Sequence, residues 1–159
     1  MALAIGPPFD DTFTADGFGP TEDGVELSVP LQQLTRGPLP AGVDVLAGSN
    51  LDEGTEFMSA TAPIACNASA AEFVAWAVLQ FGPALGPRVV SLYSEPELPA
   101  PVCEPSRHPG TAAPGASPQW IGAMRAAGDA AIGCRGRELL YAAQRAGNAG
   151  YANDESVHR

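Results

Sequence analysis

The sequence predicts an α/β protein that holds part of a mostly parallel sheet with flanking helices, and whose C-terminal half is rich in helix. The first observation is an apolar, largely β-branched run at residues 43–47, bounded by glycines. Such a run has the length and composition of a buried strand of a parallel sheet. The second is that residues 69–82 and 117–145 carry apolar side chains at helical spacing. A chain of 159 residues is about one domain's worth of sequence.

The first of these helices has a clear start and stop. Ser69 and Glu72 have the spacing of a capping box, in which the hydroxyl and the carboxylate satisfy free backbone N–H groups. Gly82 is placed to end this helix. Gly86-Pro87 is expected to begin a second short helix that continues to Tyr93.

The C-terminal helical region is predicted from its ends. Ser117 followed by Pro118 provides an N-cap and a proline at the first helical position. Gly133 is expected to divide the region into two helices, and Gly147 is expected to end it. The residues from Tyr151 onward are polar and are given no element.

The remaining segments are predicted to be irregular or brief. Residues 1–22 show no periodicity, and Asp23-Gly24 is typical of a tight turn. Pro30 is expected to open a short helix through Leu34. Residues 95–117 form a stretch rich in Pro, Ala and Gly that we interpret as a surface insert.

Composition excludes several classes of partner. The chain has 18 acidic residues against 8 basic ones, all of them Arg, for a net charge of -10. This charge would repel nucleic acid and an anionic membrane surface. We expect no membrane insertion, since the apolar runs are shorter than a span needs. Neither the cysteines nor the two histidines form a ligand cluster, so no metal and no cofactor is predicted.

The three cysteines leave the redox state open. Cys66, Cys103 and Cys134 fit either reduced thiols or one disulfide plus a cysteine with a partner elsewhere. A glycosylation sequon begins at Asn67, next to Cys66, and would be used if the chain is secreted. Such a motif also arises by chance.

The candidate catalytic residue is Glu53. Asp52 and Glu53 lie just beyond the predicted strand, where open α/β sheets build their sites. A carboxylate there can orient a histidine and stabilise the imidazolium formed during acyl transfer. The alternative is that both residues occupy the first turn of a helix, where carboxylates interact favourably with the dipole. The residue pattern leaves both interpretations open.

The other members of a catalytic triad are missing from the sequence. It contains no Gly-x-Ser-x-Gly nucleophile elbow. His108 lies in the Pro-rich insert and His158 is the penultimate residue, so both are interpreted as exposed histidines rather than as the base.

A series of motifs nevertheless resembles a known family. The motifs are, in order, Asp23-Gly24-Val25-x-Leu27, Pro30 with Leu34, Val45-Leu46-x-Gly48-x-Asn50-x-Asp52-Glu53-Gly54-Thr55-x-Phe57, Trp120, Asp129 and Cys134-x-x-Arg137. Together they resemble the type-B carboxylesterase/cholinesterase family of α/β-hydrolases over about residues 18–147. The resemblance implies that residues 1–159 are part of such a domain, with 95–117 as an insert.

The resemblance implies a role for Glu53 as the acid of a Ser–Glu–His triad that hydrolyses small carboxylic esters. By the triad order of this fold, the serine would precede Met1 and the histidine would follow Arg159, so this chain alone is expected to be inactive. It also implies secretion, a downstream partner for Cys134, and a local disulfide between Cys66 and Cys103 as the alternative to two thiols.

Two further expectations follow. A non-catalytic interaction or adhesion module is the alternative function, because esterase-like domains without a working triad serve that role. With the neighbouring strands missing, the aromatic residues Phe73, Trp76 and Trp120 are expected to lose much of their cover.

Overall fold

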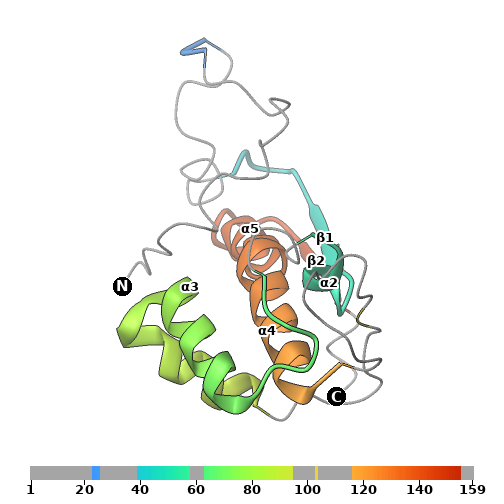
Figure 1. The fold of residues 1–159 in the computed structure, drawn as a ribbon. Coiled ribbons are helices and arrows are strands. Elements are labelled where there is room, and N and C mark those ends of the chain that lie inside the picture. Colours follow the sequence, from blue (N-terminus) through green and yellow to red (C-terminus); the bar gives the residue numbers. More distant parts are fainter. Residues whose placement is uncertain (1–22, 26–38, 58–62, 95–102, 104–115, 155–159) are drawn as a thin grey trace. The chain divides into compact units, whose positions relative to one another are not determined.

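The structure, a computed structural model, describes residues 23–25, 39–57, 63–94, 103 and 116–154 (Figure 1). The elements are, in order, β1 (Val45–Ser49), α2 (Glu53–Phe57), α3 (Ala70–Tyr93), α4 (Pro118–Gly128), the π-helical turn η2 (Asp129–Gly133), α5 (Cys134–Arg145) and β2 (Gly150–Asp154). They belong to two compact units, a first that includes residues 52–131 and a second that includes residues 39–51 and 132–154. The helices and the small sheet confirm a mixed, helix-rich α/β chain.

In the second unit, β1 and β2 form a two-stranded parallel sheet among the described residues. Val45 pairs with Gly150 and Ser49 with Asp154. Helix α5 contacts both strands. The parallel strand predicted at residues 43–47 is therefore confirmed, with its bounds shifted by two residues. Its partner β2 was not predicted, because only its pairing with β1 makes so polar a sequence a strand.

The prediction that this strand is buried is wrong for the described structure. Residues of β1 alternate between half-buried and exposed, and Leu46 is 73% exposed. Its register partner Tyr151 is 57% exposed. Parallel sheets in α/β proteins are normally covered on both faces. Here the described helix of this unit, α5, covers one face, so the face that carries Leu46 and Tyr151 stays open.

Asn148 joins the segment before β1 to the end of α5. The side chain of Asn148 is buried and accepts a hydrogen bond from Gly42 N (2.8 Å). It also donates from Nδ2 to Pro40 O (2.7 Å). Gly147, directly before it, has a φ of 78° and ends α5 as predicted. A single amide side chain thus links two segments that are far apart in sequence.

In the first unit, α3 begins with the predicted capping box. Ser69 Oγ accepts from Glu72 N (3.3 Å), and Glu72 Oε2 accepts from Ser69 N (2.7 Å). Gly82 interrupts the helix with a φ of 77°, which confirms the predicted stop. The second helical segment starts directly after it at Pro83 rather than at 86–87, because proline is favoured in the first turn of a helix.

By length and composition, α3 is a helix that could cross a membrane. Its most apolar window has a mean hydropathy of 1.2, and 28% of that window is buried. The break at Gly82 divides it into two shorter segments, and Phe73, Trp76 and Ala77 face the interior. The absence of membrane insertion stays a prediction.

The apolar core of the first unit is built between α3 and α4. Phe73 and Trp120 are 1% and 0% exposed, and Trp76 is 5% exposed. The rings of Phe73 and Trp76 lie 5.9 Å apart, and Trp76 meets Phe81 edge-on at 5.8 Å. The expectation that the aromatic residues lose their cover is wrong, since the two helices bury these rings against each other without a sheet.

A disulfide joins Cys66 to Cys103. The sequence had left open whether these cysteines are bonded or are two free thiols. Their Cα atoms are 5.8 Å apart, and both residues are buried. Cys66 also accepts a backbone hydrogen bond from Ser117 N (2.7 Å), so the start of α3 and the start of α4 are tied together. Cys134, the exposed first residue of α5, is expected to pair with a downstream cysteine only by the resemblance.

The last helical region begins as predicted, but in its middle a π-helical turn replaces the expected division into two helices. Ser117 caps α4 by accepting from Trp120 N (3.1 Å), with Pro118 at the first position. The expected division at Gly133 takes the form of the π-helical turn Asp129–Gly133, after which α5 follows directly. A π turn of this kind is a local insertion in a helix rather than a break.

Several predictions fall on residues outside the described ranges. These are the irregular segment 1–22, the short helix at Pro30–Leu34, most of the insert 95–117, His108 and His158. The expected turn at Asp23-Gly24 is described: Gly24 has a φ of 73°, and Val25 N donates to Asp23 Oδ1 (2.8 Å).

The capping box predicts a pH dependence of stability. The hydrogen bonds from Ser69 hold the pKa of Glu72 below its ordinary value of 4.5. A lowered pKa in the folded state stabilises the fold above the unfolded pKa, and this contribution is lost as the pH falls below about 4.5. We expect the stability difference between the wild type and Glu72→Gln, which keeps the box but cannot ionise, to be constant above that pH and to shrink below it. Urea denaturation at pH 6 and pH 3 measures this, and a pH-independent difference would contradict it.

Candidate functional site

Glu53 is the first residue of α2 and follows β1 after a three-residue turn. The strand ends at Ser49, and the turn covers Leu51 and Asp52. Glu53 is half-buried. Glu53 thus lies just beyond the strand, as the sequence predicted, and it is also the first residue of a helix. The alternative placement, in the first turn of a helix, describes the same position, so the geometry fits both interpretations.

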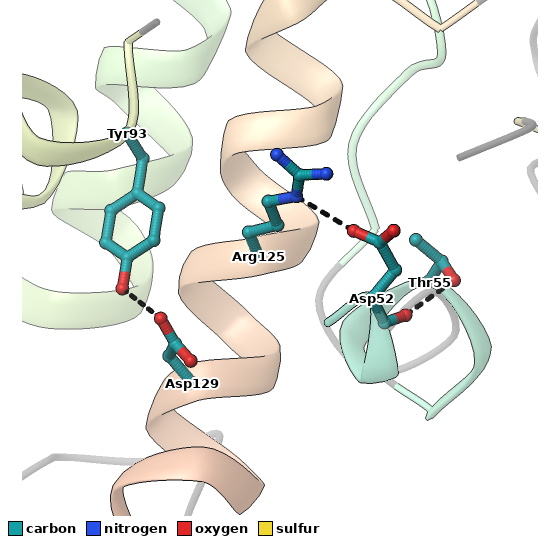
Figure 2. A network of polar contacts seen from close by, with 5 residues as sticks. All are labelled: Asp52, Thr55, Tyr93, Arg125 and Asp129. Atoms are coloured by element: carbon teal, nitrogen blue, oxygen red, sulfur yellow. Dashed lines mark hydrogen bonds and ion pairs between the residues drawn. The ribbon is translucent and has the colours of Figure 1, made fainter. Parts of the chain in front are cut away.

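Thr55 closes the turn that carries Glu53. Its hydroxyl donates to the carbonyl oxygen of Asp52 at 2.7 Å (Figure 2). Its backbone N–H donates to the same oxygen at 3.0 Å. Two hydrogen bonds on one carbonyl fix the backbone on either side of Glu53. This explains why the turn needs a hydroxyl residue at this position.

An ion pair fastens the turn to α4. Arg125 Nε donates to Asp52 Oδ1 at 2.8 Å, and Arg125 is 7% exposed while Asp52 is 27% exposed (Figure 2). A buried guanidinium is costly unless it is paired with an anion. Asp52 is therefore a structural neighbour of Glu53.

Arg125 was missed in the sequence. It is the only charged residue in the α4 sequence, and apart from Gln119 the other residues of this helix are apolar or small. A single arginine among buried positions needs a buried anion, and this pattern could have indicated a partner. The identity of the partner could not be read from the sequence, because Asp52 lies 73 residues away.

Two glycines let the backbone of the turn touch α4. A Cβ at Gly54 would lie 2.7 Å from the carbonyl carbon of Met124 and 2.8 Å from Gly128 N. A Cβ at Gly128 would lie 2.6 Å from Gly54 N. A side chain at either position would collide with the backbone of the other element, so this contact requires glycine on both.

We expect Gly54→Ala to destabilise the first unit by about 1–3 kcal/mol, because the new methyl group meets backbone atoms that cannot move aside. Urea denaturation followed by tryptophan fluorescence measures the free energy of unfolding. Gly136→Ala is the matched control: its methyl group would make an ordinary 3.8 Å contact with the Ala47 Cβ, and alanine favours helix. Equal stability of the Gly54→Ala chain and the wild type would contradict the close contact.

A second polar contact is made by Asp129, four residues after Arg125. The hydroxyl of Tyr93, at the end of α3, donates to Asp129 Oδ2 at 2.6 Å (Figure 2). Asp129 is one of the residues on which the family resemblance rests. Tyr93 was not identified as its partner, because the bond depends on how α3 packs against α4. The contact fastens the end of α3 to the C-terminal end of α4, the helix whose Arg125 binds Asp52.

The site therefore consists of a carboxylate at the start of α2, directly after a turn with a fixed backbone. Arg125, Thr55 and the Gly54–Gly128 contact fix the backbone around Glu53. Such a carboxylate can accept a hydrogen bond from an imidazole N–H and hold that ring in one orientation. Within the described ranges no three His, Cys, Asp or Glu side chains are placed to hold a metal ion. The two histidines lie outside these ranges.

Comparison with known proteins gives no relative. No family model matches the chain, and neither the curated proteins nor the solved structures contain a match.

Proposed function

We propose that this chain is the acid-bearing part of a serine carboxylic-ester hydrolase of the type-B carboxylesterase class. The observation that carries the proposal is the position of Glu53, four residues after a parallel strand and on a turn held by the Asp52–Arg125 ion pair. The block from Asn50 to Thr55 that resembles the family spans this turn, and three of its residues have a structural use: Asp52 binds Arg125, Gly54 contacts α4, and Thr55 closes the turn.

The mechanism assigns one step to this chain. A serine hydroxyl attacks the ester carbonyl while a histidine takes its proton, and Glu53 stabilises the imidazolium that results. The carboxylate keeps its charge and holds the ring so that the other nitrogen faces the serine. The serine and the histidine are supplied by segments of the enzyme other than residues 1–159, as is the oxyanion hole.

The open face of the sheet supports a place within a larger α/β sheet. Leu46 and Tyr151 are register partners on this face and are 73% and 57% exposed. A parallel sheet is stable in α/β proteins when helices cover both faces. We infer that a further helix of the complete hydrolase covers these two side chains.

The proposed partners are small carboxylic esters. The net charge of -10 gives no attraction to nucleic acid or to an anionic membrane. Secretion is part of the proposal, and the Cys66–Cys103 disulfide supports it, because disulfides persist mainly in oxidising compartments.

The first test uses the chain as it stands. We expect residues 1–159 to hydrolyse p-nitrophenyl acetate no faster than a heat-treated control, because a triad acid without nucleophile and base has nothing to orient. A fluorophosphonate probe, which labels activated serines, is expected to leave the chain unlabelled. A burst of acylation that survives further purification would refute the assignment of the serine to another segment.

The second test separates the enzyme from the interaction module. The coding sequence on both sides of this chain is expected to contain Gly-x-Ser-x-Gly upstream and a histidine at a strand end downstream. A product that begins at Met1 and ends at Arg159, and that is stable when purified, would instead favour the non-catalytic interaction or adhesion module.

A further inference from the structure

Asn67 lies at an exposed turn directly before α3. The residues on either side of it, Cys66 and Ala68, are 0% and 2% exposed, whereas Asn67 itself is exposed. The turn is closed by the hydrogen bond from Ala68 N to Ala65 O (2.9 Å). Because its two neighbours are anchored in the core, the side chain of Asn67 is presented outward at a fixed position.

Asn67, Ala68 and Ser69 form the only Asn-x-Ser/Thr motif in the sequence. This motif is the acceptor for N-linked glycans, and its middle residue is not proline. The residues that follow, from Ser69 to Glu72, are exposed as well. A bulky hydrophilic group on Asn67 would therefore extend into solvent without displacing the core.

The disulfide provides a second, independent observation. Cys66, the residue before Asn67, is joined to Cys103. Disulfides form in the compartments of the secretory route, where N-glycans are also attached. The sequon and the disulfide thus point to the same compartment from two different kinds of chemistry, and they lie at adjacent positions of the chain.

We propose that Asn67 is an N-glycosylation site. In the reaction, the side-chain amide nitrogen of Asn67 forms a bond to C1 of the first sugar of an oligosaccharide carried on a lipid pyrophosphate. The bond between that carbon and the pyrophosphate oxygen breaks, the lipid pyrophosphate leaves with the electron pair, and the amide loses one proton. The site is separate from Glu53 and does not depend on the proposed ester hydrolysis.

Ser69 has two roles, which the test must separate. Its hydroxyl completes the sequon, and it also caps α3 by accepting from Glu72 N and donating to Glu72 Oε2. Ser69→Ala would remove both the sequon and the cap. Ser69→Asp removes the sequon and keeps a good cap, while Ser69→Thr keeps both. Asn67→Gln removes the acceptor and leaves the cap intact.

The experiment translates the full chain, behind a cleavable secretion leader, into endoplasmic-reticulum microsomes. Protection from added protease identifies the chains that reached the lumen. We expect the wild type and Ser69→Thr to show a reduced gel mobility that peptide-N-glycosidase restores, and Asn67→Gln and Ser69→Asp to lack it. Mass spectrometry of the tryptic peptide 37–88 is then expected to find aspartate at position 67, which the glycosidase leaves where it has removed a glycan from asparagine.

Two outcomes would overturn the proposal. One is that the protease-protected wild-type and Ser69→Thr chains both remain unmodified. The other is that the mobility shift persists in Asn67→Gln, which would place the carbohydrate elsewhere.

Discussion

Glu53→Gln in the ester hydrolase that contains this chain is expected to lower kcat by about four orders of magnitude, with KM for p-nitrophenyl acetate nearly unchanged. The amide has almost the same shape as the carboxylate but no charge, so it cannot stabilise the imidazolium. It can also donate a hydrogen bond, which favours the wrong tautomer of the histidine. Because this stabilisation arises only as the proton moves, the loss falls on kcat rather than on substrate binding.

Two variants serve as controls for this measurement. Glu72→Gln removes one carboxylate from the exposed start of α3 and keeps the capping box, so kcat is expected to stay at the wild-type value. Glu53→Asp keeps the charge and withdraws it by one methylene group, so an intermediate kcat is expected. Wild-type activity in Glu53→Gln would remove this residue from the triad, whatever the stability of the variant.

Loss of the disulfide is expected to have the largest effect on stability. Cys66 and Cys103 are separated by 37 positions. A loop of this length corresponds to about 4 kcal/mol of stabilisation through the reduced entropy of the unfolded chain. Both cysteines are buried against the α3–α4 core. We therefore expect Cys103→Ser to unfold at a much lower urea concentration than the wild type.

Cys134→Ser is the matched control for the disulfide variant. Cys134 is exposed at the start of α5, where a substitution is expected to change the free energy of unfolding by less than about 0.5 kcal/mol. Adding a reductant to the wild type should reproduce the Cys103→Ser curve and leave that of Cys103→Ser itself unchanged. A wild-type midpoint that does not respond to reduction would show that the bond contributes nothing to stability.

The features that could be predicted from the sequence are those set by neighbouring residues. The Ser69–Glu72 box, the Ser117-Pro118 start and the break at Gly82 each depend on side chains within a few positions of the backbone they serve. Strand β1 was found for a related reason, since its β-branched run lies between two glycines. Its parallel pairing was also predicted, whereas the burial predicted for it is wrong.

The features that could not be predicted depend on residues distant in sequence. β2 becomes a strand only through its register with β1, and the partner of Arg125 lies 73 residues before it. The close contact of Gly54 with Gly128 likewise joins two elements whose packing the sequence does not specify. For the candidate site, the turn and its carboxylate were predicted, whereas the contacts that make it rigid were not.

The Asn148 side chain joins residues 106 positions apart, and this separation has a consequence for synthesis on the ribosome. β1 leaves the ribosomal tunnel long before β2 and Asn148 are translated. It can pair only after synthesis has passed residue 154. Helices α3 and α4, with the Cys66–Cys103 disulfide beside them, need only residues up to about 131 and are able to fold first. The sheet is therefore the last part to assemble, and a nascent chain stalled before residue 148 is expected to have its helices without its strands.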